Sequence, residues 1–393
     1  MKIDTVCFVG AGTMGCYNAL VAALGGYRAV LFDSSAPALE AVAQRQLGMA
    51  AMLVGAGHCT QSAVEDALSR VTTCSDLAIA TREADLVSES VFERLDLKRE
   101  IHQQLDAVCP PDAILTTNSS VLLVSQIEDV VDRGERFAAL HSHLGSPLVD
   151  IVAGSRTAPE VVALLEAYVR SLGGEPLVLR KEYPGYVLNA MLGPLLGTSL
   201  ALVAQGLAAH EDLDRAWMLH TGAPMGPFGM MDLFGLNLIN DSWTYVEGET
   251  NKERLRPAIL ALLQPYLERG ALGMAAGEGF YSYPEPAYQQ PAFRKVLDGD
   301  EERYCSLAAM VVANALAVIA NDVVPAAEAD RAWRVGMGVA QGPSNMLQDM
   351  GEQRLREILA VHVRADRCSG KLATLALNNL DVLVLPQAEE AAE

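Results

Sequence analysis

Basic side chains are scarce in this sequence of 393 residues. Lys and Arg number 29 against 49 Asp and Glu, which gives a formal net charge of −20 at pH 7. Such an excess of negative charge keeps a protein soluble and repels polyanions. A surface for nucleic acid or for anionic lipid would need clustered cations. We therefore expect a small-molecule partner, with neither nucleic acid nor a membrane.

Cysteine is also too sparse and too irregular to define the fold. The sequence has seven cysteines, an odd number, and no two of them form a C-x-x-C. This excludes a disulfide framework and a zinc cluster of the usual spacing, and the lone histidines show no metal-ligand spacing either. We expect no metal site and a reducing, cytoplasmic location. The N-terminus runs straight into a strand, without the apolar core of a secretory signal.

One long stretch, residues 186–209, lacks charged side chains altogether. It has the length of a membrane span, which needs about 20 apolar residues. However, Asn189, Gly193, Pro194, Gly197 and Gln205 interrupt it. We predict a buried helix of a soluble domain.

Strand and helix patterns alternate through the first half of the chain. The predicted strands are Thr5–Val9, Arg28–Asp33, Leu86–Ser88, Ile114–Thr116, Phe137–His141 and Pro176–Leu179. The helical patterns that we assign between them are Gly15–Leu24, Pro37–Leu53, Leu95–Val108 and Pro159–Leu172. Strands that alternate with helices through short connections indicate a parallel, doubly wound sheet. The fold class is therefore α/β, with a Rossmann domain over residues 1–183.

Beyond Pro184 the strand signals vanish, and long helical runs carry an internal repeat. The sequence Asp-Arg-Ala-Trp occurs at 214–217 and again at 330–333, and a Gly-Pro pair follows each copy in the same register. A fixed spacing between such matches is the signature of a duplicated structural unit. We predict two tandem all-α modules, residues 184–285 and 286–393.

A glycine-rich turn follows the first strand. It is a G-x-G-x-x-G motif, in which glycines allow a tight turn and a close approach of backbone to a pyrophosphate at the helix N-terminus. Asp33 ends the second strand at about the expected distance of 20 residues, where a carboxylate binds the ribose hydroxyl and repels a 2′-phosphate. We predict NAD rather than NADP, with a Rossmann-like site for another nucleotide as the alternative. The predicted contacts besides Asp33 are Gly10, Gly12, Thr13, Met14 and Gly15.

The chain as a whole resembles the 3-hydroxyacyl-CoA dehydrogenase family, including its gulonate dehydrogenase/lambda-crystallin and carnitine dehydrogenase branches. The resemblance covers nearly the whole chain and implies NAD-dependent oxidation of a 3-hydroxyl group, in fatty-acid metabolism for the acyl-CoA members. The family-like blocks, in family order, are VGAGTMG, ADLVSESVFERLDLK, TTNSS, RFAALH, LVDIV, PGYVLNAML and GAPMGPF.

The resemblance also implies site residues. Glu93, Lys98 and Asn118 match family positions on the cofactor side. The catalytic group implied by the family consists of Ser120, His141, Asp150 and Asn189.

The chemistry of these residue types agrees with that assignment. Oxidation of an alcohol needs a base for the hydroxyl proton, and histidine titrates near neutral pH. A carboxylate on the other ring nitrogen fixes the tautomer and stabilises the imidazolium. We expect His141 to take the proton and Asp150 to orient it, while Ser120 and Asn189 hold the substrate oxygen. His143, two residues further on the same strand face, is the rival base. A hydrolase triad is disfavoured because no G-x-S-x-G occurs.

The sequence departs from the family near the histidine. Leu144 stands where the family has an asparagine, the stretch from His141 to Asp150 is short, and Asp150 replaces a glutamate. Only Arg45 and Arg70 could meet CoA phosphates in the segment after the second strand. A short 3-hydroxyacyl-CoA is our first substrate hypothesis.

Three alternatives stay open. They are a free 3-hydroxy acid, a carrier-protein thioester, which the acidic chain disfavours, and a degenerate NAD-binding or structural protein. For assembly we expect a homodimer, or a monomer in which the second helical module mimics a partner subunit.

Overall fold

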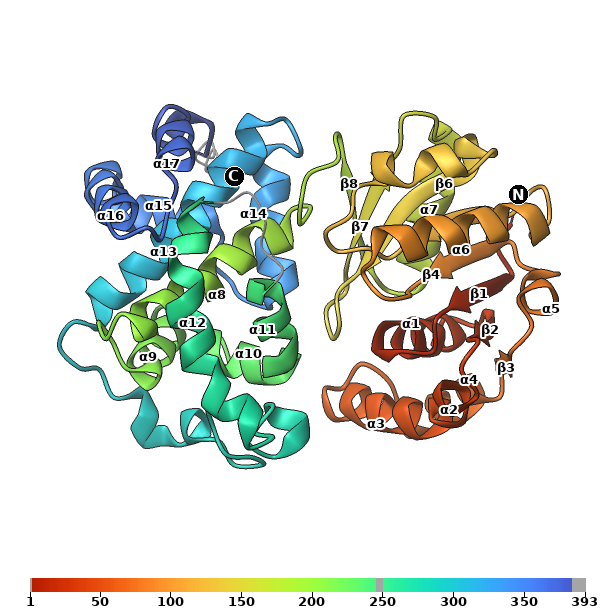
Figure 1. Cartoon of the computed structure of the whole chain (residues 1–393), viewed down its shortest axis with the longest axis horizontal. Helices are drawn as coiled ribbons and strands as arrows, with labels where there is room; N and C mark the ends of the chain where they lie inside the picture. The colour runs from red at the N-terminus through yellow and green to blue at the C-terminus, as the bar shows by residue number, and fades with distance from the viewer. Residues whose placement is uncertain (1, 245–249, 384–393) are drawn as a thin grey trace, which may run out of the picture. The chain divides into compact units, whose positions relative to one another are not determined.

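The computed structural model of the chain describes residues 2–244 and 250–383. The chain divides into two compact units, Met1–Tyr186 and Val187–Glu393 (Figure 1). The first unit is the α/β domain and the second contains helices without a named strand among its described residues. The predicted fold class is confirmed. The two predicted helical modules lie together within the second compact unit.

An eight-stranded sheet forms the centre of the first unit, in the order β3-β2-β1-β4-β5-β6-β7-β8. Its strands are β1 (Thr5–Val9), β2 (Arg28–Phe32), β3 (Val71–Cys74), β4 (Leu86–Glu89), β5 (Ile114–Thr117), β6 (Phe137–Ser142), β7 (Leu148–Ala153) and β8 (Glu175–Leu179). β1, with two parallel neighbours, is buried along its whole length. A strand covered on both faces is expected to be apolar throughout, as TVCFV is.

The helices of this unit are α1 (Thr13–Leu24), α2 (Ala36–Glu40), α3 (Val42–Gly55), α4 (Gln61–Leu68), α5 (Leu77–Thr81), α6 (Leu95–Val108) and α7 (Pro159–Ser171). Three short 3-10 turns follow β5: η1 (Val124–Gln126), η2 (Glu128–Val130) and η3 (Gly134–Arg136). Buried residues of α1, α3, α4 and α7 join the sheet in one apolar core. The packing of α1 requires Gly15, since a Cβ there would lie 1.8 Å from the carbonyl oxygen of Gly10.

The sheet is not wholly parallel, which the sequence prediction did not foresee. β6 and β7 pair antiparallel, with His141 directly opposite Asp150. Five residues, 143–147, separate these strands, and a connection that short joins antiparallel neighbours because a parallel pair needs a crossover of a dozen residues or more. The short stretch noted in the sequence is therefore the turn of a hairpin, which places His141 and Asp150 opposite each other on two strands.

The second unit is built from helices α8 (Leu188–Ala204), α9 (His210–Thr221), α10 (Pro227–Phe234), α11 (Leu236–Thr244), α12 (Thr250–Glu268), α13 (Asp300–Ala320), α14 (Ala326–Met337), α15 (Pro343–Met350), α16 (Glu352–Arg364) and α17 (Gly370–Leu377). Its 3-10 turns are η4 (Met274–Ala276), η5 (Ala287–Gln289), η6 (Pro291–Arg294) and η7 (Leu380–Leu383).

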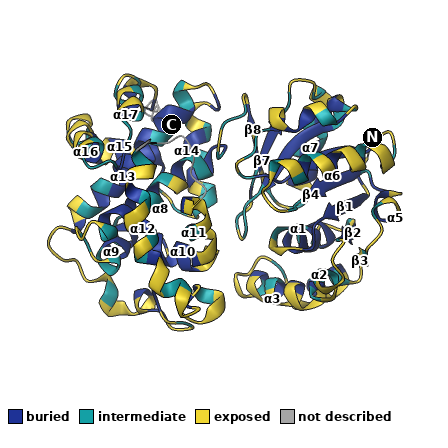
Figure 2. Cartoon of the chain, in the orientation of Figure 1, coloured by how far each residue is buried: buried dark blue, intermediate teal, exposed yellow. Residues whose placement is uncertain are grey.

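Among the described helices of this unit, α13 and α8 carry the largest sets of buried residues (Figure 2). The uncharged stretch forms α8, which has ten buried residues, as predicted for a buried helix. Within residues 2–244 and 250–383, α13 is the one helix long and apolar enough to cross a membrane, and 72% of its most apolar window is buried. Such burial is typical of the core helix of a soluble domain.

Candidate active site

The glycine turn between β1 and α1 has the geometry of a dinucleotide site. Gly10 has a φ of +107°, and a Cβ there would lie 2.7 Å from the carbonyl oxygen of Ser90. A Cβ at Gly12 would meet nothing within 4 Å, so the backbone is open on that side. Thr13 and Met14 then begin a 12-residue helix. The unpaired N–H groups of this helix end are available to a pyrophosphate.

The acidic residue at the end of β2 lies beside this turn. One carboxylate oxygen of Asp33 accepts the N–H of Ala11 at 2.8 Å, and the other accepts the N–H of Ser35 at 2.8 Å. The structure therefore brings Asp33 to the glycine motif, as an adenosine ribose site requires. Arg45 of α3 also reaches the turn and donates to the carbonyl oxygen of Ala11. The sequence had suggested this arginine for CoA.

Glu93 organises the turn that follows β5. Its Oε1 accepts the backbone N–H of Ser120 at 3.1 Å and of Val121 at 2.9 Å, with Leu122 at 3.2 Å. The hydroxyl of Ser119 donates to the same oxygen. A single carboxylate thus holds the backbone that carries Ser120, so Glu93 is a positioning group whatever else it contacts.

Lys98 is paired with Glu93 as the family pattern implied, but it lies inside the protein. Its ammonium is 3.4 Å from Glu93 Oε2 and 2.6 Å from Glu89 Oε1, and its side chain is 1% exposed. Glu89 also accepts hydrogen bonds from His102 and Thr117. Glu89 is fully buried, so it is not a solvated surface charge.

The charge on Glu89 is stabilised by these partners. Burial alone would raise the pKa of Glu89, but the hydrogen bond from His102 and the ammonium of Lys98 outweigh it and lower the pKa to about 2. The buried cluster therefore carries an ionised carboxylate at neutral pH. It links α6, which supplies Lys98 and His102, to the ends of β4 and β5.

The side chain of Asn118 connects the end of β5 to the end of β6 by hydrogen bonds. Its Oδ1 accepts the N–H of Ser142 at 2.9 Å and the hydroxyl of Ser142 at 3.1 Å. Ser142 donates in turn to Asn18 of α1 at 2.7 Å. Through Ser142, Asn118 is thus connected to α1, the helix that follows the glycine motif. A contact between Asn118 and the cofactor stays a prediction.

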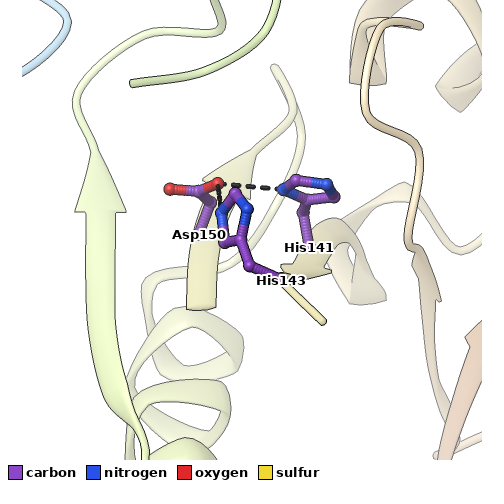
Figure 3. A group of neighbouring side chains, drawn as sticks. All are labelled: His141, His143 and Asp150. Atoms are coloured by element: carbon purple, nitrogen blue, oxygen red, sulfur yellow. Dashed lines mark hydrogen bonds and ion pairs between the residues drawn. The ribbon is translucent and has the colours of Figure 1, made fainter. Parts of the chain in front are cut away.

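His141 stands between a hydroxyl and a carboxylate. Its Nε2 is 3.0 Å from Ser120 Oγ. Its other ring nitrogen, Nδ1, is 3.0 Å from Asp150 Oδ2 (Figure 3). His141 is 3% exposed and Asp150 is fully buried. The structure brings these three predicted residues together in the order that proton abstraction requires.

The electrostatics fix the tautomer of His141. Burial would raise the pKa of Asp150, but the hydrogen bonds to His141 and His143 outweigh it and lower that pKa below its usual range. An ionised carboxylate is an acceptor only, so Nδ1 carries the proton and Nε2 keeps its lone pair. Burial and the neighbouring His143 lower the pKa of His141, against the opposing effect of Asp150. His141 is therefore neutral at pH 7.

His143, the rival base, binds the same carboxylate oxygen. Its Nε2 is 2.9 Å from Asp150 Oδ2, and its ring centroid is 4.4 Å from that of His141. Ser120 bonds to His141 rather than to His143. The sequence signal was the i, i+2 spacing, which places both histidines on one face of the strand.

Asn189 lies in the first turn of α8 and thus in the second unit. The helix N-cap is Val187, so Asn189 does not cap the helix. Its role toward the substrate stays a prediction.

Two family models match the chain. They are the NAD-binding domain of 3-hydroxyacyl-CoA dehydrogenase over residues 5–183 and its C-terminal domain over residues 185–283. A probable 3-hydroxyacyl-CoA dehydrogenase of Caenorhabditis elegans is 31% identical over 292 residues, which cover 72% of this chain and 96% of the relative.

Solved structures agree with the sequence relatives. A 3-hydroxybutyryl-CoA dehydrogenase from Escherichia coli K12 is 25% identical with a TM-score of 0.74, and the match covers 97% of this chain and 100% of that one. A diketoreductase is 34% identical with a TM-score of 0.65, over 72% of this chain and 100% of that one. The predictions of an oxidoreductase and of NAD as its cofactor are confirmed. The chain belongs to the 3-hydroxyacyl-CoA dehydrogenase family.

Proposed function

We propose that this chain interconverts a short 3-hydroxyacyl-CoA and the 3-ketoacyl-CoA with NAD, using His141 as the base. The observation that carries the proposal is the line from Ser120 Oγ through His141 to Asp150, with 3.0 Å at each step. This line lies in the same unit as the glycine turn, at the end of β6, beside strands β5 and β7. Open α/β sheets bind their ligands at this kind of edge.

The residues of the chain divide the reaction between them. The substrate hydroxyl donates its proton to Nε2 of His141, and Asp150 stabilises the imidazolium that results. Ser120 donates to the substrate oxygen, while Glu93 holds the backbone of Ser120 in place. NAD, when bound, supplies the acceptor for the hydride that leaves the carbinol carbon. In the reverse direction, the imidazolium returns the proton to the oxygen of the ketone.

A free 3-hydroxy acid is the second candidate substrate, favoured by the positions of two arginines. Arg45 donates to the carbonyl oxygen of Ala11, and Arg70 donates to that of Ala23 at 3.4 Å. Both cations of the segment after β2 are thus engaged with backbone rather than clustered for CoA phosphates. The diketoreductase that resembles this chain is described by its action on dicarbonyl compounds.

We expect NADH oxidation with acetoacetyl-CoA and not with free acetoacetate. The measurement is the decrease in NADH absorbance with each substrate at matched concentrations. Turnover of the free acid alone would reject the thioester proposal and support the second candidate. An absence of turnover with both, while NADH still binds, would support the third hypothesis of a degenerate protein.

The pH dependence should report a base with a lowered pKa. Burial and His143 lower the pKa of His141 below 6.5, whereas Asp150 and Glu93 oppose this. Because the neutral ring then persists to lower pH, kcat/KM for alcohol oxidation should rise with pH through a value below 6.5 and level off above it. Initial rates from about pH 5 to pH 8 test this. An acid limb centred above 6.5 would contradict the assignment.

The second helical module is, we propose, a structural copy of the first. Asp214 accepts the N–H groups that begin α10, at Phe228 and Gly229, and Asp330 accepts the N–H of Ser344 at the start of α15. The two repeated tryptophans meet edge to face, with ring centroids 6.2 Å apart. Such a pairing supports a monomer in which the copy replaces a partner subunit, with a homodimer as the alternative.

The cellular setting is likewise a proposal. All seven cysteines lie among the described residues and are unpaired there. Unpaired thiols fit a reducing cytoplasm. A place in fatty-acid metabolism would follow from an acyl-CoA substrate.

A further inference from the structure

We propose that His141, His143 and Asp150 form a binding site for Zn²⁺, and that zinc bound there switches off the catalytic base. The sequence predicted no metal site, because the three residues have no familiar ligand spacing. The structure brings them together from two adjacent strands (Figure 3). The inhibitory effect rests on the proposed role of His141, whereas the binding site does not.

The ligand atoms converge on one point. His141 Nδ1 and His143 Nε2 lie 3.0 Å and 2.9 Å from Asp150 Oδ2, and the three ligand atoms lie within 4.8 Å of one another. Both ring nitrogens are therefore aimed at the same oxygen. An ion ahead of the two nitrogens, at the usual Zn–N distance of about 2.0–2.1 Å, needs only a small retreat of the carboxylate.

The second carboxylate oxygen of Asp150 points away from the two rings and reaches the ion only when the carboxylate rotates (Figure 3). This oxygen, Oδ1, is buried and has no hydrogen-bond partner among the described residues. A buried polar atom without a partner costs about 1–3 kcal/mol, so a ligand that engages it is favoured. Rotation of the carboxylate can present Oδ1, Oδ2 or both to a cation between the rings.

The strands hold this arrangement before any metal binds. His141 lies opposite Asp150 in the antiparallel register, and His143 follows two residues later on the same face. The His143 side chain is 10% exposed, while those of His141 and Asp150 are almost completely buried. Such a site loses little conformational entropy when the ion binds.

Ligand type selects the class of metal. Two imidazole nitrogens and one carboxylate suit Zn²⁺ and neighbouring transition metals, while Ca²⁺ and Mg²⁺ prefer oxygen ligands. Glu93 adds negative potential near His141. Water can complete the coordination, since open zinc sites commonly have three protein ligands.

Zinc on Nδ1 removes the function of the other ring nitrogen. A neutral imidazole that donates its Nδ1 lone pair to a metal carries its only proton on Nε2. Nε2 then donates to Ser120 or to the substrate oxygen and cannot accept the hydroxyl proton. Zinc should therefore lower kcat with little change in KM.

The test measures binding apart from turnover. Metal-free full-length protein is titrated with CoCl₂, whose visible spectrum reports the ligands, and with ZnCl₂ by calorimetry. We expect His143→Gln to weaken binding by about ten-fold or more, since loss of even an outer-shell partner costs 10–100-fold. His58→Gln, at an exposed histidine that is not one of the three ligands, should bind zinc like the wild type.

A second variant shows whether weaker binding by His143→Gln comes from the loss of a ligand or from a folding defect. His143→Cys restores a soft ligand and should recover binding with an added cobalt–thiolate band. In steady-state assays, zinc should lower kcat of the wild type, and a chelator should restore it.

The outcomes separate the two proposals. Equal zinc affinity in the wild type and in folded His143→Gln, or binding that disappears on alkylation of the native cysteines, overturns the metal site. Binding that depends on His143, in a protein without turnover on any tested substrate, supports the site and rejects the proposed function.

Discussion

Replacement of His141 by Gln is expected to lower kcat by about 10²–10⁴-fold, the usual contribution of a general base. Glutamine keeps a polar group near Ser120 but cannot accept a proton at neutral pH. The fold should tolerate the change, because the Gln side-chain amide can still donate to Asp150. The measurement is steady-state turnover with the best substrate found, in both reaction directions.

The matched control for this prediction is binding of the cofactor. Among the described residues, no hydrogen bond joins His141 to the glycine turn or to Asp33. Fluorescence titrations should therefore show the same NADH affinity for His141→Gln as for the wild type. A His58→Gln variant controls for the general effect of losing a histidine. A decrease in kcat of less than ten-fold in His141→Gln would mean that another group takes the proton, with His143 the first candidate.

The sequence located the parts of this site that local rules determine. The glycine motif needs a strand before it and a helix after it, and both are present at β1 and α1. The predicted helix over 95–108 is α6 with the same bounds, because its apolar spacing is strongly periodic. Ser120 and His141 were placed by family motifs, and the structure joins them by a hydrogen bond.

The parts that were missed depend on contacts between distant residues. β3 is an edge strand, VTTC, whose two exposed threonines give no apolar run. The predicted helix over 37–53 is divided at Ala41 into α2 and α3. β7 was not predicted as a strand, and its antiparallel direction follows from the five-residue connection to β6. Pairing directions of this kind are set by tertiary packing rather than by propensity.

The buried charges were the least predictable feature. Glu89 and Glu93 are four residues apart and look alike in the sequence, yet Glu89 is completely buried while the Glu93 side chain is 36% exposed. Nothing local distinguishes them. The difference arises because β4 ends at Glu89 in the middle of the sheet, under α6, while Glu93 lies in the connection beyond it.

This buried cluster leads to the largest expected effect on stability, in Lys98→Met. Removal of the ammonium leaves Glu89 as a buried carboxylate with His102 and Thr117 as its remaining side-chain partners. Breaking a buried ion pair from one side typically costs about 3–5 kcal/mol, because the uncompensated charge cannot reach water. Urea unfolding followed by far-UV circular dichroism should show that decrease in the free energy of unfolding of the first unit.

Two further variants serve as controls for the stability change in Lys98→Met. Arg94→Met removes an ion pair with Asp96 in which both side chains are about two-thirds exposed, and exposed pairs contribute only about 0–1 kcal/mol. The double variant Lys98→Met with Glu89→Gln removes the unpaired charge and should recover part of the loss, since neutral groups are cheaper to bury. If Lys98→Met and Arg94→Met lower the free energy of unfolding equally, the Lys98–Glu89 pair does not stabilise the buried, ionised carboxylate.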